Sequence, residues 1–130
     1  MEEVGSTAQV KVFIDKKKNR IFFVFAGDIL DASASEPLPA ITRKACEQLK
    51  QGFTCLADFA RLNLLSLPDI AEKVQGELLR AGVQKVASVW AKDSFAKMVV
   101  DRSSEKVGSE YDSRRKPFMD RALAEKWLDE

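Results

Sequence analysis

The chain of 130 residues contains no histidine, the side chain that most often serves as a general base at neutral pH and as a nitrogen ligand for metals. It contains only two cysteines, Cys46 and Cys55, which are too few for a structural zinc site, and we expect both to be reduced and buried. Glycine-rich phosphate loops and the Gly-x-Ser-x-Gly motif of hydrolases are also missing. The sequence therefore predicts a protein that is not an enzyme and that uses no metal or cofactor.

Long apolar runs and an excess of either charge are missing as well. No window approaches the ~20 apolar residues of a membrane-spanning helix, and the N-terminus carries acids where a signal peptide needs bases. The 21 basic and 20 acidic residues give a formal net charge of +1, without the basic excess of a general nucleic-acid binder. We therefore expect a cytoplasmic protein without membrane insertion and without specific nucleic-acid binding.

Strand and helix patterns alternate along most of the chain. Residues 8–15 and 20–27 are β-rich and flank a short polar turn, which predicts an antiparallel hairpin with Asn19 in the turn. Three later strands are expected at 53–59, 85–90 and 114–118. The predicted fold class is α/β, a single mixed sheet of four to five strands that begins with an antiparallel hairpin, in the order β-β-α-β-α-β-α-β-α. Residues 1–130 form one domain, with residues 1–7 as a flexible N-terminal tail.

Helix boundaries follow from capping residues and from the spacing of apolar residues. Ser35 is expected to cap the first helix, and Asp93 or Ser94 to cap the helix after the fourth strand. In that later helix, Phe95, Met98 and Val99 are expected to point into the core.

The stretch from Leu56 to Ile70 (LADFARLNLLSLPDI) is similar to the switch region of the STAS domain of bacterial anti-sigma-factor antagonists. In those proteins a strand ending in an Asp-hydrophobic pair leads to Asp-Ser-Ser-Gly, and a partner kinase phosphorylates the first Ser. Here Asp58 begins the matching pair. The four motif positions are held, in order, by Ser66, Leu67, Pro68 and Asp69. The acceptor is therefore a leucine, and the phosphorylation switch does not carry over.

A further resemblance covers nearly the whole chain. The stretches GVQKVASVWAKDSFAKMVVDR and FMDRALAEKWL look like those of the small, uncharacterised bacterial SpoIIAA-like group. That group is related in shape to the CRAL-TRIO lipid-transfer domain. The resemblance implies a SpoIIAA-like fold, and its residues are mostly packing positions that say little about activity.

Three polar positions are candidates for a site. Ser66 fits the Ser-x-x-Asp form of a capping box, which we favour over a phosphorylated residue. Asp58 is expected at the carboxyl end of a central strand, where ligands bind in open α/β sheets, with Asp93 and Ser94 at the same edge one strand over. A loop hydrogen bond for Asp58 and a helix cap for Asp93 are the simpler interpretations, and two carboxylates alone do not indicate a metal site.

Leucines crowd the expected loop between the third strand and the following helix: Leu62, Leu64, Leu65 and Leu67. Part of this set must cover the sheet edge, and any exposed remainder would be a surface for a partner or an apolar ligand. An exposed leucine cluster or an unpaired first strand is also compatible with a homodimer.

Two functions remain open. The first is a non-enzymatic regulatory or protein-interaction module of STAS-like type, which binds a protein partner through the loop from Arg61 to Asp69 and the next helix. The alternative is a carrier of a small apolar or anionic, lipid-like ligand held between Asp58 and Asp93. Both functions rest on analogy between folds.

Overall fold

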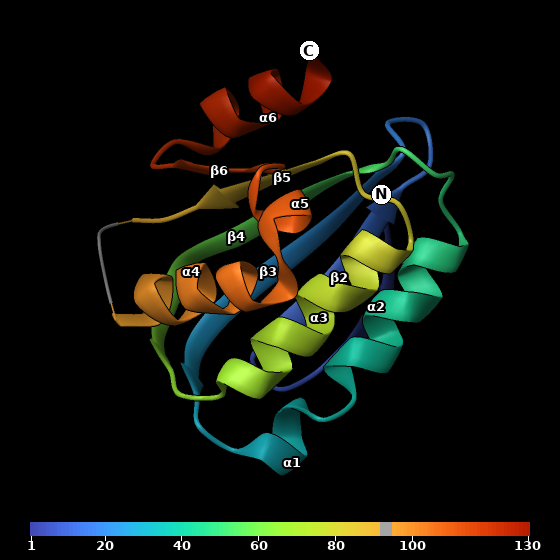
Figure 1. The fold of residues 1–130 in the computed structure, drawn as a ribbon. Coiled ribbons are helices and arrows are strands. Elements are labelled where there is room, and N and C mark those ends of the chain that lie inside the picture. The colour runs from blue at the N-terminus through green and yellow to red at the C-terminus, as the bar shows by residue number, and fades with distance from the viewer. Residues whose placement is uncertain (92–94) are drawn as a thin grey trace.

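In the computed structural model, which describes residues 1–91 and 95–130, a single six-stranded sheet has helices on both of its faces (Figure 1). Neighbouring strands in the sheet are also neighbours along the chain, from β1 at one edge to β6 at the other. The strands are β1 (Glu2–Ser6), β2 (Val10–Asp15), β3 (Arg20–Ile29), β4 (Thr54–Leu65), β5 (Lys85–Val89) and β6 (Arg115–Phe118). The sheet is mixed, because β1, β2 and β3 pair antiparallel whereas β3, β4, β5 and β6 pair parallel.

The helices pack as two unequal layers. They are α1 (Ala32–Ser35), α2 (Leu38–Glu47), α3 (Pro68–Arg80), α4 (Phe95–Val107), α5 (Ser109–Asp112) and α6 (Arg121–Asp129). The larger layer contains α2, α3 and α4, and α6 alone packs over β4, β5 and β6 on the opposite face (Figure 1). Within the described residues, every helix is too short or too polar to cross a bilayer.

The predicted hairpin is confirmed, and Asn19 fixes its turn. Asn19 has a φ of 53°, a left-handed conformation that asparagine tolerates better than most residues. Its side chain donates to the carbonyl of Lys50 at 3.1 Å and accepts from the amide of Lys50 at 2.8 Å. The turn is therefore tied to the loop that leads into β4.

The expected number of strands and the expected N-terminal tail are wrong. Six strands are present, and residues 2–6 form β1 instead of a tail. This strand is held by its pairing with β2 and by the close approach of Gly5 to Ile41 of α2. The element order is accordingly β-β-β-α-α-β-α-β-α-α-β-α, with two additional short helices.

The expected cap at Ser35 is also wrong. Ser35 is the buried last residue of α1, and the cap of that helix is Asp31, whose carboxylate accepts from the amide of Ser33 at 2.9 Å. The longer helix α2 follows with Pro37 at its N-cap position and no side-chain cap. Pro37 has no side-chain acceptor to cap the helix, and Pro39 in the first turn removes one of the amides that a cap would satisfy.

The core has one part on each face of the sheet. On the larger face, three aromatic rings stack across β3, β4 and the end of β5, with centroids 4.5 Å apart for Phe25–Phe59 and 4.2 Å apart for Phe59–Trp90. On the other face, α6 buries Ala124 and Leu128 against the sheet. The buried guanidinium of Arg20 anchors this helix through a 2.7 Å contact with Asp129.

Candidate functional site

Asp58 lies in β4 on the face that α6 covers, and its carboxylate has partners there. One oxygen accepts from the amide of Ala60 at 3.0 Å, and the other lies 3.5 Å from the guanidinium of Arg121 in α6. The local hydrogen bond to Ala60 is the simpler of the two interpretations that the sequence left open. The expected position of Asp58 at the carboxyl end of the strand is wrong, because β4 continues to Leu65; Asp58 instead links the middle of β4 to the start of α6.

The other polar candidates at this edge are Asp93 and Ser94, which lie outside the described residues. In the described part of the chain, no three acidic or cysteine side chains are grouped so that they could hold a metal ion.

Ser66 is not a helix cap. The N-cap of α3 is Leu67, and no side chain caps that helix. The amide of Ser66 instead donates to the carbonyl of Ile29 at 3.1 Å, which continues the pairing of β3 with β4. Because β4 runs on to Leu65, Ser66 lies one position too early to reach the first turn of α3. Its side chain is exposed, and its phosphorylation stays a prediction.

The leucine-rich segment is mostly strand, not loop. β4 extends to Leu65 because two irregularities in its register with β3 let the pairing continue beyond Asp58. Leu62 and Leu65 are buried and Leu67 packs partly against the core, whereas Leu64 is 46% exposed. The predicted partner surface is therefore reduced to Leu64 within this segment.

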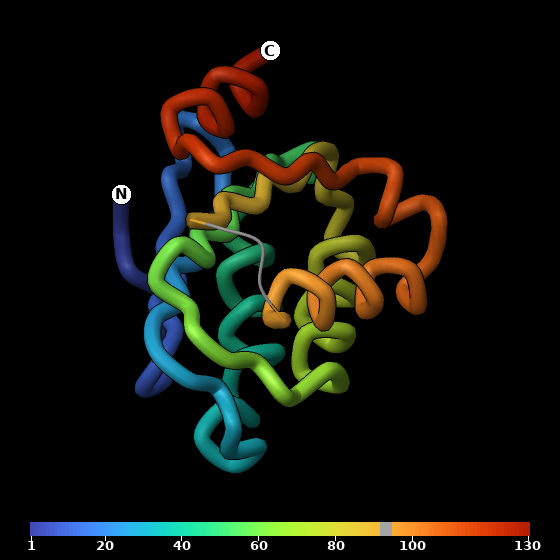
Figure 2. The backbone as a smooth tube through the Cα atoms, turned by 90° about the vertical axis from the view of Figure 1, so that its left-hand side faces the viewer, coloured from blue at the N-terminus to red at the C-terminus, as the bar shows by residue number. Residues whose placement is uncertain are grey.

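Exposed apolar side chains occur in the segments at the carboxyl ends of the parallel strands. With the exception of Met1, every exposed large hydrophobic side chain of the described residues follows or ends one of these strands. We call this set the apolar edge: Leu30 after β3, Leu64 in β4, Phe95 and Met98 in the helix after β5, and Met119 and Leu123 after β6. The parallel strands point to the left in Figure 1, so Figure 2 views this edge of the sheet directly.

Sequence reasoning placed two members of the apolar edge in the core. Phe95 and Met98 are exposed, because α4 packs through a different stripe, formed by Ala96, Val100, Ser103 and Ser104. These positions are spaced by four, three and one residues, which is one face of a helix. Small residues on this stripe allow α4 to pack closely. Their helical spacing in the sequence was the signal that could have shown that the large residues, Phe95 and Met98, point outward.

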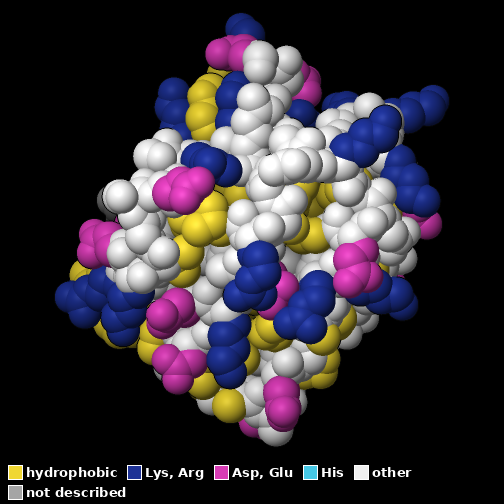
Figure 3. All heavy atoms as spheres, turned by 45° about the vertical axis from the view of Figure 1, so that its right-hand side comes forward, with side chains coloured by type: hydrophobic (Ala, Val, Ile, Leu, Met, Phe, Trp, Pro, Cys, Tyr) yellow, Lys and Arg dark blue, Asp and Glu magenta, His cyan; other side chains and the backbone are white. Residues whose placement is uncertain are grey.

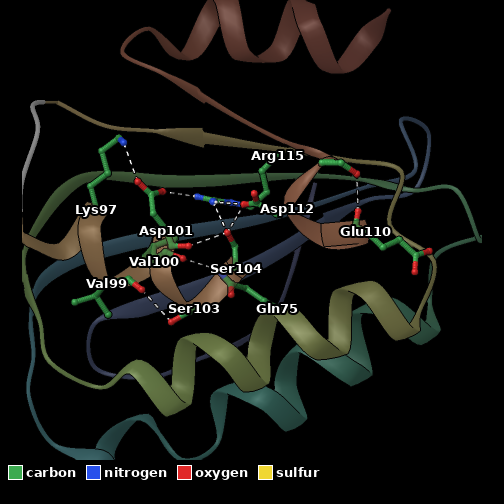
Figure 4. Close-up of polar contacts among 11 residues, drawn as sticks. Gln75, Lys97, Val99, Val100, Asp101, Ser103, Ser104, Glu110, Asp112 and Arg115 are labelled. Atoms are coloured by element: carbon green, nitrogen blue, oxygen red, sulfur yellow. Dashed lines mark hydrogen bonds and ion pairs between the residues drawn. The ribbon is translucent and has the colours of Figure 1, made fainter. Parts of the chain in front are cut away.

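A polar cluster fixes α4 and α5 against β6 (Figure 4). The guanidinium of Arg115 in β6 lies between the carboxylate of Asp101, at 3.0 Å, and the hydroxyl of Ser104, at 2.7 Å. Ser104 donates in turn to the carboxylate of Asp112 in α5 at 2.5 Å. Ser104 is fully buried, so its hydroxyl is not an exposed nucleophile, and the cluster serves to hold α4 and α5 against β6.

A partly open cavity of about 60 Å³ lies on the other side of the sheet from Asp58. Its walls come from the sheet and from α3, α4 and α5, and include Phe25, Ala57, Val74, Val100 and Tyr111. Asp58 is not among the residues that line it. The cavity and the Asp58 carboxylate are therefore separate features.

The two cysteines are free and buried, as predicted. Burial raises the pKa of the Cys46 thiol to about 12 and raises the pKa of the Cys55 thiol well above its usual value. Thiolate is the reactive form of cysteine, so neither side chain is a nucleophile near neutral pH.

Charged side chains of both signs are intermixed over α2 and α3 (Figure 3). In the groove between these helices, the carboxylate of Glu77 contacts Arg43 and Arg80, both at 2.9 Å. Such pairing leaves this face without a strong field of one sign.

The mixed sheet with helices on both faces defines a fold class, and a solved structure identifies it as SpoIIAA-like, the type found in STAS domains. That structure is an uncharacterised protein of the DUF3478 family from Shewanella loihica, described as having a SpoIIAA-like fold. It is 18% identical to this chain, with a TM-score of 0.64, and the match covers 95% of this chain and 98% of that one. No protein-family model matches the chain, and no curated protein matches it in sequence. Likeness at this level of identity extends to the fold alone.

Proposed function

We propose that this chain is a non-enzymatic protein-interaction module of STAS-like type, which regulates a protein partner by binding it through the apolar edge. The observation that supports the proposal is that exposed Leu, Phe and Met side chains end or follow each of the strands β3 to β6 along the chain. In open α/β sheets this end is the usual place for binding.

The composition of the apolar edge supports a protein partner. Phenylalanine and methionine are enriched at protein interfaces, and lysine, glutamate and aspartate are depleted at their centres. Phe95 and Met119 are 61% and 74% exposed, so both would lose a large apolar surface to water on binding a partner. Methionine also adapts its shape to different partners, which suits a regulatory surface.

Regulation through the STAS phosphorylation switch is not part of this proposal. Leu67 stands at the acceptor position and carries no hydroxyl. Affinity for the partner would instead depend on apolar burial at the edge.

The alternative function, a carrier of a lipid-like or anionic ligand between Asp58 and Asp93, has weaker support. The Asp58 carboxylate already contacts Ala60 and Arg121. The cavity on the opposite face is about 60 Å³, well below the roughly 150 Å³ of a cavity that is known to bind benzene. An acyl chain would therefore need α3 and α4 to move apart.

Site-specific photo-cross-linking in cells of the source organism tests the interaction module. A photoreactive amino acid would replace Leu64, Phe95 or Met119 at the apolar edge, one at a time. Matched controls at the opposite end of the strands are Lys17, in the turn before β3, and Gln84, just before β5; both are exposed.

We expect the three edge positions to give adducts with the same protein and the control positions to give none. A self-adduct from the edge positions alone would identify a second copy of this chain as the partner. The proposal would be abandoned if the edge positions gave no specific adduct, or if the controls captured the same protein equally well.

A further inference from the structure

The cavity is an apolar space with a few polar groups in its wall. Apolar side chains from the sheet and from α3 and α4 make most of its lining, and it is partly open to solvent. The polar contributions include Gln75 of α3, Ser88 of β5 and Tyr111 of α5. A small number of polar groups in an otherwise apolar wall is typical of sites for small molecules.

Gln75 is the polar group that remains unsatisfied. Its side chain reaches from α3 toward α4 (Figure 4), where Nε2 donates to the carbonyl of Val100 at 3.3 Å. The residue is 6% exposed, and its Oε1 is buried with no hydrogen-bond partner among the described residues. A buried acceptor without a donor is unfavourable and rare in native proteins, and Gln75 is one of the residues that line the cavity, so a donor from a bound molecule would satisfy it.

We propose that this cavity binds a compact, mainly apolar molecule that presents one N–H or O–H donor to Oε1 of Gln75. The apolar wall would supply the affinity, and the single donor would fix the orientation of the ligand. The cavity is about 60 Å³, less than half of a cavity of roughly 150 Å³ that binds benzene, so a small ring would lie partly in the cavity and partly in its open mouth. This site is separate from the apolar edge.

Pyrrole and furan form a matched pair of probes for this site. Both are five-membered aromatic rings of nearly the same size, but pyrrole has an N–H donor and furan has only an acceptor. Each would be titrated into the ¹⁵N-labelled full chain, with the amide shifts followed by NMR. We expect pyrrole to shift amides around the cavity, including those of Val74, Gln75 and Val100, and to bind about tenfold more tightly than furan.

Two variants separate the roles of donor recognition and volume. Gln75→Leu removes the acceptor, so pyrrole and furan should then bind equally; Gln84→Leu is the same change at an exposed position and should leave the tenfold preference intact. Ala71→Leu keeps Gln75 but fills part of the cavity, so it should weaken the binding of both probes.

The native protein alone can overturn the proposal, whether or not the variants fold. Equal affinity for pyrrole and furan would show that Gln75 does not select a donor. Shifts from neither probe, as expected if the cavity holds only ordered water, would also overturn it. Because these titrations do not involve the apolar edge, their failure would leave the photo-cross-linking result unaffected.

Discussion

Replacing Gly76 by alanine should stabilise the protein, because this glycine lies inside α3 without a structural reason for being there. An added Cβ at Gly76 would meet no atom within 4 Å, and the helical backbone there suits any L-residue. Alanine is favoured over glycine inside a helix by about 0.8–1 kcal/mol, since glycine loses more backbone freedom on folding. For a domain of this size, that gain corresponds to a rise in Tm of about 3–5 °C.

The same substitution at Gly82 should have the opposite sign. Gly82 follows α3 with a φ of +94°, and its amide donates to the carbonyl of Leu79 at 3.0 Å, while Val83 donates to Leu78 at 3.1 Å. These bonds form a Schellman motif, which places a left-handed residue directly after the helix. A side chain there costs about 1–2 kcal/mol in backbone strain, and its Cβ would lie 2.5 Å from Cγ of Gln51.

Urea unfolding of the native chain, Gly76→Ala and Gly82→Ala, followed by circular dichroism, measures both effects in one experiment. We expect the unfolding midpoints to move in opposite directions with little change in the slope of the transition. A neutral or destabilising Gly76→Ala would refute the reasoning. It would mean that α3 is not a regular helix at Gly76, or that other atoms fill the space that the added methyl group needs.

Three further substitutions test the polar contacts. A hydrogen bond from Arg43 holds the pKa of Glu77 below its usual value of 4.5. The ionised carboxylate of Glu77 therefore adds to the free energy of unfolding above pH 4.5, and this stabilisation is lost as the pH falls through the lowered pKa. Glu77→Gln should therefore cost about 1 kcal/mol in urea unfolding at pH 7, reduced by the exposure of its arginine partners, and the difference should shrink as the pH falls below 4.5. Asp129→Asn leaves the buried guanidinium of Arg20 without its carboxylate, and it should lower Tm by several degrees and expose the amides of α6 first to hydrogen exchange; an unchanged α6 would contradict this. Ser104→Ala should cost about 1–3 kcal/mol by unpairing the buried cluster beneath α5, with faster exchange in α5 and β6 as the direct readout.

Local patterns in the sequence were sufficient for most of the sheet but not for its first strand. The hairpin and the strands β4 and β5 have apolar or alternating runs that predict them without further information. In contrast, residues 2–6 contain Val4 as their only large apolar side chain, and the strand exists because β2 offers an edge for pairing. Pairing between segments is a non-local property, which the pattern of one segment does not contain.

The outer half of β4 was missed for a different reason. Its pairing with β3 shifts register near Ala26 and again at Gly27–Asp28. Each shift interrupts the alternation of inward and outward side chains, so Leu62 and Leu65 both point inward although they are three residues apart. An alternation test therefore fails beyond Asp58, and the segment resembles a loop.

The apolar edge could not be predicted because large hydrophobic side chains were taken as the buried ones. In α4 the opposite holds, since the buried face consists of small residues and leaves Phe95 and Met98 outside. Hydrophobicity predicts that a residue can be buried. The size of the space between α4 and the sheet decides which residues of α4 are in fact buried. Leu64 is the one residue that belongs both to the leucine cluster predicted from the sequence and to the apolar edge.

The connection from β4 to α3 differs from the STAS switch region at the positions that would hold a phosphate. Leu67, at the acceptor position of STAS domains, is half-buried against the core, and Pro68 follows as the first residue of α3. A helix start attracts a phosphate through its free N–H groups, but proline has none to offer. Asp69 adds a negative charge in the same turn, which would repel a phosphate on the neighbouring Ser66. The connection from β4 to α3 therefore lacks the residues of the STAS switch, and the exposed large apolar side chain next to it in the chain is Leu64.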